Sequence, residues 1–380
     1  MAEESRIRVG VIGANPTTFA SHSHLPAIKA LPHYELVAVA TTRMETAQAS
    51  AQKFGAPYAF ADPARLIEHP DVDLVAVVVK VPAHYELVHA ALSAGKHVYC
   101  EWPLGLNVDE AEALAELARR SGLAHLVGLQ GMNSPGAAYV AELVASGRIG
   151  SPVAVSSVTN GTPSGRQIPE HLVYAMDRAS GANLLTVSTG HALSAVGRIL
   201  GPFAKVSAVV ESLTPEVTVL ETGATTRMSS PDQVAIVGTL QCGAVASVTV
   251  QGGTAEVLAR QGGSARPPGP GFEVRIVGTE ATLAIRPSVP ERIHMAEWQI
   301  TMTRSDGSTE QLPVPDRLVP IPDSLKGGPA RNVAAMYYHL ADAILGGKPL
   351  SPDFDVAVKY HRLIEAVQRA SDLGTAQILN

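Results

Sequence analysis

The sequence predicts an α/β protein with two parts. The first is a doubly wound parallel sheet, and the second is an α+β domain with a large, mostly antiparallel sheet. Three observations support this prediction. The chain has 380 residues, which is too long for one typical core. Its first third alternates short apolar runs with helical patterns, and longer alternating runs follow Gly150. We place the domains at residues 1–130 and 131–380.

Short apolar runs mark the expected strands of the first part: Ile7–Ile12, Tyr34–Ala40, Leu74–Val79, His97–Cys100 and Leu126–Leu129. Helical patterns lie between or after them, at Leu25–Leu31, Met44–Phe54, Ala83–Ala94, Asn107–Ser121 and Pro135–Ser146. Strands that are apolar on both faces and joined by helical crossovers indicate a parallel sheet with helices on both sides.

The second part has longer runs in which apolar and polar residues alternate: Val153–Val158, Lys205–Glu211, Gln233–Gln241, Val245–Gln251, Phe272–Ile285 and Trp298–Thr303. Turn signals such as Cys242-Gly243 and Asp306-Gly307 separate them. This pattern is typical of an antiparallel sheet with one buried face. Two helical segments, Arg331–Leu345 and Phe354–Asp372, end the chain.

The composition excludes several classes of partner. The formal charge is −6 and there is no run of Lys or Arg, so neither nucleic acid nor an anionic membrane is expected to bind. Cys100 and Cys242 lie in apolar runs and are predicted to be buried thiols. There is no secretory signal and no bilayer-spanning segment, which predicts a soluble cytoplasmic protein. The histidines include His22 and His24, but no set has metal-ligand spacing.

A nucleotide-binding turn is predicted after the first strand. Gly13 follows that strand, and Asn15 stands where the fingerprint G-x-G-x-x-G has its next glycine. Asn tolerates a left-handed backbone better than most residues, so the turn can survive. A plain βα turn is the alternative, but the position at the start of a series of βα units favours a dinucleotide site.

The end of the second strand indicates which dinucleotide binds. NAD sites often carry an acidic residue there, but this chain has Thr42 and Arg43. A hydroxyl and a permanently charged guanidinium suit a 2′-phosphate better. We therefore expect NADP(H) to be preferred, with NAD(H) remaining possible. The alternative is that Arg43 is only a solvated residue in the first turn of a helix.

Several short motifs together resemble the Gfo/Idh/MocA family of sugar and inositol dehydrogenases. They are His24-Leu25-Pro26-Ala27, Gly95-Lys96-His97-Val98 with Glu101 and Pro103, Gly147-Arg148-Ile149-Gly150, and Gly190-His191. Other pieces are similar to the branch that contains the fungal galactose-pathway repressor: Glu101-Trp102, Leu129-Gln130-Gly131 and Thr186 before Gly190. The resemblance implies a Rossmann-type nucleotide-binding domain and a second domain that binds substrate and pairs subunits.

The resemblance also implies catalytic roles. A lysine, an aspartate and a histidine usually gather at the substrate in this family. The histidine corresponds to His191, which becomes the expected proton carrier because an ordinary imidazole titrates near neutral pH. The lysine corresponds to Trp102, which cannot exchange a proton but offers a flat surface to a sugar ring. The aspartate corresponds to Val187 or Thr186.

Further residues are assigned expected roles. His191, Lys80 and Tyr174 are the candidate catalytic residues, and a desolvated lysine would titrate near neutral pH. The candidate substrate residues are Trp102, Asp177, Asn183 and Thr186. The candidate cofactor residues are Gly13, Asn15, Thr42, Arg43, Val79, His84, Glu101, Trp102 and Gln130.

Two functions remain open on the sequence. The first is an NAD(P)-dependent oxidoreductase that transfers a hydride between the nicotinamide and a sugar, cyclitol or related polyol. The second is a dinucleotide-binding sensor that regulates a partner without turnover. The missing lysine and aspartate favour the sensor, and the retained histidine favours the enzyme. The resemblance implies a homodimer.

Overall fold

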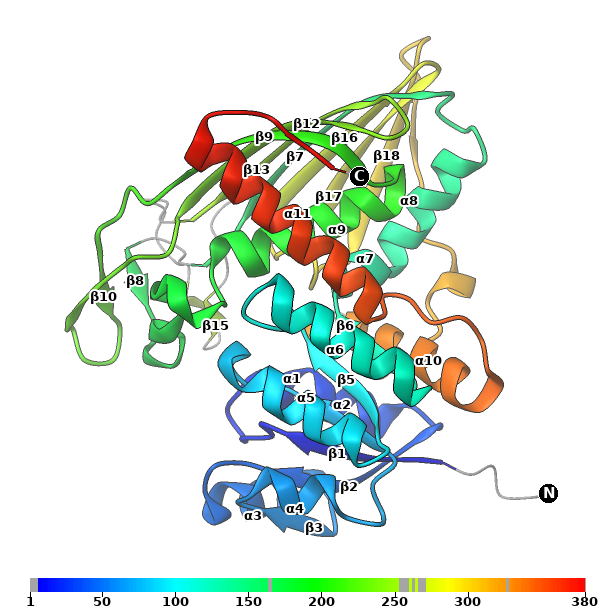
Figure 1. Cartoon of the computed structure of the whole chain (residues 1–380). Coiled ribbons are helices and arrows are strands. Elements are labelled where there is room, and N and C mark those ends of the chain that lie inside the picture. Colours follow the sequence, from blue (N-terminus) through cyan, green and yellow to red (C-terminus); the bar gives the residue numbers. More distant parts are fainter. Residues whose placement is uncertain are drawn as a thin grey trace. The chain divides into compact units, whose positions relative to one another are not determined.

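The computed structural model describes residues 6–162, 166–252, 260–261, 264–265, 271–325 and 328–379 (Figure 1). These residues form two compact units. The first is Met1–Gly128 with Pro320–Lys359, and the second is Leu129–Val319 with Tyr360–Asn380. The sequence predicted a second domain that covers all of 131–380. The structure instead returns 320–359 to the first unit, because helix α10 (Pro329–Gly346) packs against α2 (His24–Ala30).

The first unit is built on a parallel sheet, as predicted, with six strands where the sequence indicated five. Its strand order is β3-β2-β1-β4-β5-β6, so the order reverses direction between β1 and β4. The strands are β1 (Ile7–Ile12), β2 (Tyr34–Ala40), β3 (Tyr58–Phe60), β4 (Leu74–Val77), β5 (His97–Glu101) and β6 (His125–Gly128). In open α/β sheets such a reversal is where ligands bind, at the carboxyl ends of the strands.

Helices join these strands. They are α1 (Phe19–His22), α2, α3 (Met44–Phe54), α4 (Pro63–Ile67), α5 (His84–Ser93) and α6 (Val108–Ser121). The sequence predicted α2, α3, α5 and α6 but not the short helices α1 and α4. Helix α10 belongs to this unit but follows β19 (Thr309–Gln311) in the chain. Helix α6 shows why the bounds are readable. The Asn107 side chain accepts a hydrogen bond from the Glu110 amide, two acids occupy the first turn, and Gly122 ends the helix with φ of 67°.

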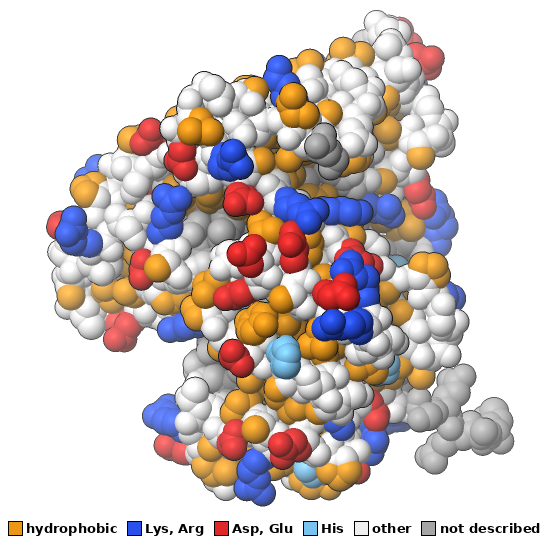
Figure 2. Space-filling model, in the orientation of Figure 1, with side chains coloured by type: hydrophobic (Ala, Val, Ile, Leu, Met, Phe, Trp, Pro, Cys, Tyr) orange, Lys and Arg blue, Asp and Glu red, His pale blue; other side chains and the backbone are white. Residues whose placement is uncertain are grey.

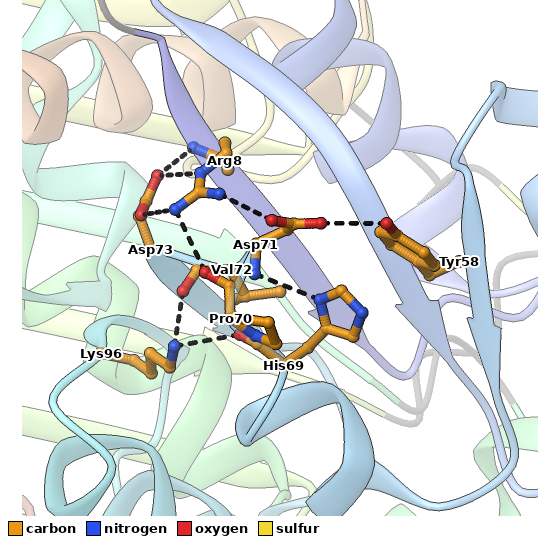
Figure 3. A network of polar contacts seen from close by, with 8 residues as sticks. All are labelled: Arg8, Tyr58, His69, Pro70, Asp71, Val72, Asp73 and Lys96. Atoms are coloured by element: carbon orange, nitrogen blue, oxygen red, sulfur yellow. Dashed lines mark hydrogen bonds and ion pairs between the residues drawn. The ribbon is translucent and has the colours of Figure 1, made fainter.

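A polar network ties the amino ends of β1 and β4 together (Figure 3). The Arg8 guanidinium donates to both carboxylate oxygens of Asp73, at 2.8 and 3.0 Å, and to Asp71 at 3.0 Å. Asp71 also accepts from the Tyr58 hydroxyl at 2.9 Å, and Lys96 donates to the Val72 carbonyl at 2.8 Å. These groups lie at the opposite end of the strands from the carboxyl ends, so they serve the fold.

The second unit is built on a nine-stranded sheet in the order β19-β18-β17-β16-β7-β13-β12-β9-β20. All its pairs are antiparallel except β13 with β7, which confirms a mostly antiparallel sheet. The strands are β7 (Pro152–Asn160), β9 (Phe203–Glu211), β12 (Gln233–Leu240), β13 (Val245–Gln251), β16 (Phe272–Gly278), β17 (Ala281–Pro287), β18 (Trp298–Arg304), β19 (Thr309–Gln311) and β20 (Gln377–Ile378).

Smaller sheets and helices complete this unit. The short strands are β8 (Gln167–Ile168), β10 (Glu216–Val219), β11 (Thr225–Arg227), β14 (Arg260–Gln261) and β15 (Ser264–Ala265). The helices are α7 (Gln130–Asn133), α8 (Pro135–Ala145) and α9 (Thr189–Leu200), and α11 (Phe354–Leu373) begins in the first unit and ends in the second. Helix α9 packs on β7 and β13 and is buried along most of its length.

The two cysteines differ in exposure, whereas both were predicted to be buried. Cys100 is buried as predicted, but Cys242 is exposed because it lies in the turn between β12 and β13. Acidic and basic side chains are interspersed on the face seen in Figure 2. Within the described ranges, no helix combines the length and apolar composition that a bilayer crossing requires.

Candidate functional site

In the first unit, the sequence-predicted cofactor residues gather at one edge of the parallel sheet. Gly13 follows β1, Thr42 and Arg43 follow β2, Val79 follows β4, and Glu101 ends β5. The strands β2, β1, β4 and β5 are neighbours in the sheet, so their carboxyl ends are adjacent. Because the strand order reverses between β1 and β4, this edge is the position expected for a dinucleotide.

The turn after β1 requires glycine at position 13. Gly13 has φ of 89°, and a Cβ there would lie 2.0 Å from the Val78 carbonyl oxygen. Asn15 does not take the left-handed conformation that the sequence predicted, since no described non-glycine residue has a positive φ. Its side-chain oxygen instead accepts hydrogen bonds from the Thr17 amide and hydroxyl at 3.1 and 3.0 Å. Asn15 thus stabilises the turn through its side chain.

The loop after β2 presents Thr42 and Arg43 to solvent. Thr41, which is buried, fixes this loop: its hydroxyl contacts the Arg43 carbonyl at 2.8 Å and the Thr46 hydroxyl at 2.6 Å. Arg43 is the N-cap residue of α3. An exposed hydroxyl and guanidinium at the carboxyl end of β2 can both reach a phosphate.

Three predicted site residues, Val79, Lys80 and His84, lie between the end of β4 and the first residue of α5. Lys80 is exposed, so it is not the desolvated lysine that was expected. Val79 is half-buried, and its carbonyl lies 3.0 Å from Nε2 of His84. His84 is fully buried, and its Nδ1 lies 2.7 Å from the Pro103 carbonyl. The imidazole therefore joins the loop after β4 to the loop after β5.

Burial lowers the pKa of the His84 imidazole more than the two carbonyls and the nearby Glu101 and Glu110 raise it. A carbonyl only accepts, so each of these contacts needs an N–H from the ring. Both contacts are to the protein's own backbone, which makes His84 a residue that positions loops.

The end of β5 and the loop after it contain Glu101-Trp102-Pro103, in which tryptophan stands at the position that corresponds to the family lysine. Glu101 is half-buried, and its Oε1 lies 3.1 Å from Nε2 of the buried His24. Trp102 is only 5% exposed, and a cis peptide bond joins it to Pro103. The sequence suggested an open indole surface for a sugar ring, whereas in the structure most of the indole is covered.

In the second unit, His191 forms a pair that the sequence did not reveal. Its ring lies parallel to that of His294, with 3.8 Å between centroids and 12° between planes. His191 begins the buried face of α9, and His294 lies in the loop between β17 and β18. Gly131 allows this packing, because a Cβ there would lie 3.1 Å from the His191 carbonyl oxygen.

Charge and burial keep both imidazoles neutral. Burial, followed by the positive charge of Arg292, lowers the pKa of His191 to about 3. Burial, His191 and Arg292 together lower the pKa of His294 well below its ordinary value. An ordinary imidazole pKa was expected for His191 from the sequence, and burial together with Arg292 contradicts that expectation. Among the described residues, Nδ1 of His191 and Nε of Arg292 are buried without a hydrogen-bond partner.

Two of the expected substrate residues are used by the fold. The Asn183 side-chain oxygen accepts from the amides of Leu185 and Thr186 at 3.0 and 3.2 Å. The Thr186 hydroxyl accepts from the Asn183 amide at 2.9 Å. Together they cap the π-helix Leu184–Ser188, which leads into α9. Because this π-helix leads directly into α9, the two side chains stabilise the segment that precedes His191.

The remaining expected residues of the second unit are Asp177, Tyr174 and Gln130. Asp177 is exposed and accepts from the Ala179 amide at 3.0 Å and from the Ser229 hydroxyl at 3.3 Å, so it caps a turn. Tyr174 is half-buried in the 3-10 helix Glu170–Met176, and burial raises the pKa of its hydroxyl. Gln130 is buried at the start of α7, the helix that packs on α9.

Sequence reasoning missed four residues that the structure places in these clusters: His24, Tyr337, Arg292 and His294. His24 lies in a motif that was quoted for the family resemblance, but nothing in the sequence connects it with Glu101, 77 positions away. Arg292 and His294 lie in a loop without periodicity. Within the described ranges, no three His, Cys, Asp or Glu residues are grouped so that they could hold a metal ion.

Comparison with known families agrees with the two-part organisation. Residues 7–129 match the model of the Gfo/Idh/MocA oxidoreductase family with its NAD-binding Rossmann fold. Residues 135–287 match the model of the Gal80p C-terminal domain.

The individual proteins that are similar to the chain include both dehydrogenases and Gal80 proteins. The dehydrogenase AclE of Aspergillus oryzae is 34% identical over 224 residues, which are 57% of this chain and 61% of that protein. The matches to this and two further curated relatives span 58% to 61% of those relatives' lengths. A super-repressor mutant of Gal80p from Saccharomyces cerevisiae superposes with a TM-score of 0.84 at 21% identity and covers 98% of both chains. Levoglucosan dehydrogenase in complex with NADH and L-sorbose gives 0.83 at 21% identity and covers 99% of both.

Proposed function

The chain combines a Gfo/Idh/MocA-type Rossmann domain with a Gal80p-like C-terminal domain, and from this premise we propose that it is an NAD(P)-dependent oxidoreductase acting on a sugar, cyclitol or related polyol. One observation carries the proposal: residues suited to a dinucleotide lie at the carboxyl ends of adjacent strands where the sheet order reverses. The similarity to a dehydrogenase at 34% identity supports it.

The residues of the first unit fit a dinucleotide. The turn at Gly13 brings backbone close to backbone, and glycine is the only residue that avoids a clash there. We assign Thr42 and Arg43 to a 2′-phosphate, and Glu101 to a hydroxyl of the nicotinamide-side ribose. When bound, the nicotinamide would accept or supply the hydride, which is the chemistry that the protein itself cannot provide.

Proton transfer is assigned to His191. The alcohol of a polyol must lose a proton as it is oxidised, and an imidazole can take it. Burial and Arg292 both lower the pKa of this group. A bound substrate must therefore raise it again, either by accepting a hydrogen bond from the imidazolium or by bringing negative charge. His294 and Arg292 belong to the same cluster and are assigned to substrate hydroxyls.

A turnover assay tests this function. The purified full-length protein is mixed with NAD⁺ or NADP⁺ and a panel of polyols, cyclitols and aldoses, and the absorbance of the reduced nicotinamide is followed. We expect turnover with at least one substrate. We also expect His191→Asn to abolish turnover while dinucleotide affinity, measured by fluorescence titration, stays within about twofold. His89→Asn, at an exposed histidine of the first unit, is the matched control and should leave the rate unchanged.

A regulatory sensor is the second candidate function. It is favoured by the tryptophan at the position of the family lysine and by the neutral, buried His191. The similarity of residues 135–287 to the Gal80p C-terminal domain supports it as well. Dinucleotide binding without turnover across the whole panel would establish this candidate in place of the enzyme.

We also propose a homodimer formed through the large sheet. The register of β9, β12, β13 and β7 places uncharged side chains in rows on one face. Val209, Val237, Val245 and Val158 are the large members and are 44–57% exposed. Charged residues flank the rows, with Lys205 and Glu211 on β9 and Glu273 and Arg275 on β16. An uncharged centre with a charged rim is the usual composition of a protein interface.

A further inference from the structure

A buried chain of polar side chains leads to Glu101 inside the first unit. The Tyr337 hydroxyl lies 2.9 Å from Nδ1 of His24, and Nε2 of His24 lies 3.1 Å from Oε1 of Glu101. Three segments that are far apart in the sequence supply these groups: α10, α2 and the last residue of β5. Tyr337 and His24 are fully buried, whereas Glu101 is half-buried at the carboxyl edge of the sheet.

The direction of the hydrogen bonds follows from the chemistry of the groups. A carboxylate only accepts, so Nε2 of His24 donates to Glu101. A neutral imidazole then has Nδ1 as its acceptor, and the Tyr337 hydroxyl donates to it. The hydroxyl keeps its proton, because burial, Tyr34 and Glu101 together raise the pKa of Tyr337 well above its ordinary value. The chain therefore runs as donor to acceptor from Tyr337 through His24 to Glu101.

Aromatic packing holds the imidazole in this orientation. The ring of His24 lies 5.0 Å from that of Tyr99, 5.7 Å from that of Tyr337 and 5.9 Å from that of Phe19. The contacts with Phe19 and Tyr337 are edge-to-face, at 74° and 89°. A ring enclosed on several sides cannot turn without displacing its neighbours. His24 thus offers Glu101 a fixed donor.

We propose that His24 and Tyr337 are positioning residues that hold the Glu101 carboxylate in place for a hydroxyl of the cofactor's nicotinamide-side ribose. The role of Glu101 rests on the proposed function. A free glutamate side chain loses rotamer entropy when it binds a ligand, and one that is already held by a buried donor loses less.

The structure offers a closely matched control for Tyr337. The Tyr34 hydroxyl donates to the Tyr337 carbonyl at 2.6 Å, and it is buried in the same aromatic cluster. It makes no contact with His24 or Glu101 in the hydrogen bonds described. Tyr34→Phe and Tyr337→Phe therefore each remove one buried hydroxyl, but only the second interrupts the chain to Glu101.

The test measures the dissociation constants of NADH and NADPH by fluorescence titration of the full-length protein, together with the thermal midpoint of each variant. We expect His24→Phe to weaken both cofactors about tenfold and Tyr337→Phe to weaken them about threefold to fivefold, the effect of one net hydrogen bond. Tyr34→Phe should lower the thermal midpoint as much as Tyr337→Phe does, while both dissociation constants stay within about twofold. His24→Gln, whose amide can still donate to Glu101, should restore most of the affinity.

A second measurement tests the hydrogen bonds among Tyr337, His24 and Glu101 and needs no cofactor. Nitrogen-15 NMR of histidine-labelled protein should show His24 protonated at Nε2 and unprotonated at Nδ1, with a changed Nδ1 shift in Tyr337→Phe and an unchanged one in Tyr34→Phe. Equal cofactor affinities for Tyr337→Phe and Tyr34→Phe would overturn the proposal, and so would a His24 protonated at Nδ1. If the expected tautomer is found but the wild type binds neither dinucleotide, the proposed function fails, and the positioning role fails with it. If His24→Phe does not fold, Tyr337→Phe and His24→Gln decide the question.

Discussion

The imidazoles of His191 and His294 lie face to face, with 3.8 Å between ring centroids. Two protonated imidazoles at this distance would repel each other, and Arg292 adds further positive charge. The pair is therefore stable in its neutral form. A ligand that brings negative charge or accepts hydrogen bonds would favour protonation of one ring, and the charge on that ring would disfavour protonation of the other.

The first prediction concerns acid stability. The pKa of His191 is about 3 in the folded state and about 6.5 when unfolded. Between these values the unfolded chain binds one more proton, so acidification below pH 6.5 lowers the free energy of unfolding by up to about 1.4 kcal/mol per pH unit. Urea denaturation between pH 7.5 and 4.5 should show a shallower dependence for His191→Gln. The exposed control His89→Gln should match the wild type, and an unchanged slope for His191→Gln would contradict the assignment.

The second prediction concerns the amino end of the parallel sheet. Burial, the largest influence, would raise the pKa of Asp73, but the hydrogen bonds from Arg8 hold it below its ordinary value. The stabilisation is therefore present above the unfolded pKa of about 3.9 and is lost as the pH falls through the folded value. Asp73→Asn should lower the free energy of unfolding by about 1–2 kcal/mol at pH 7, since these groups are partly exposed. The difference from the wild type should shrink below pH 4, and Glu273→Gln, in an exposed pair with Arg286, should have little effect.

The third prediction separates two costs of replacing a glycine. Gly13 and Gly55 both have positive φ, at 89° and 79°, but only Gly13 has a backbone atom within reach of an added Cβ. Gly55→Ala should destabilise the protein by about 1 kcal/mol through backbone strain alone. Gly13→Ala should cost at least about 2 kcal/mol more, because Val78 must move, and dinucleotide binding should be lost. Thermal denaturation and fluorescence titration measure these effects, and equal effects of the two substitutions would show that the turn tolerates a side chain.

The fourth prediction tests cofactor preference. Arg43→Ala should weaken NADPH about tenfold or more, since it removes a charge-assisted contact, and should change NADH by no more than about twofold. Arg120→Ala, at a residue with 67% exposed side chain on α6, controls for the loss of net charge. Isothermal titration calorimetry gives both affinities. Equal losses for the two cofactors would remove the basis for an NADP(H) preference.

The fifth prediction tests the sheet interface. Val237→Lys places a charge in the middle of the uncharged rows and should convert a dimer into a monomer. Val289→Lys changes an equally apolar side chain, 45% exposed in the loop after β17, and should leave the dimer intact. Analytical ultracentrifugation resolves one 39.7 kDa chain from two. A wild type that sediments as a monomer at every concentration would contradict the proposal.

The sequence was sufficient for the main architecture because the strand patterns are unusually clear. Ile7–Ile12, Tyr34–Ala40 and Val245–Gln251 were predicted with the bounds that the structure shows. Helix α9 was not predicted, although its polar residues His191, Ser194 and Arg198 recur at helical spacing. Strand β3 has three residues, which is too short for an alternation to be recognised.

The site was less predictable because it depends on contacts between distant segments. Gly13 follows from the turn that it must make, but the partner that excludes a side chain is Val78. Asn183 was assigned to the substrate from its position before His191, and Thr186 from its correspondence to the family aspartate; that their side chains also cap a helix could not be read from the sequence. The low pKa of His191 depends on its burial and on the charge of Arg292, about 100 residues later in the chain. Periodicity and local motifs carry no information on such neighbours.

Residues 320–359 belong to the first unit although they are synthesised after most of the second unit, and this affects when the first unit can finish folding. A nascent chain that has just released Gly128 from the ribosome holds every strand of the parallel sheet, but not α10 and therefore not Tyr337. At about 5–20 residues per second, the nearly 200 residues up to α10 take on the order of tens of seconds to synthesise. During that time the surface of α2 that α10 covers stays exposed. The nucleotide-binding half of this protein is thus among the first parts to be translated and among the last to be completed.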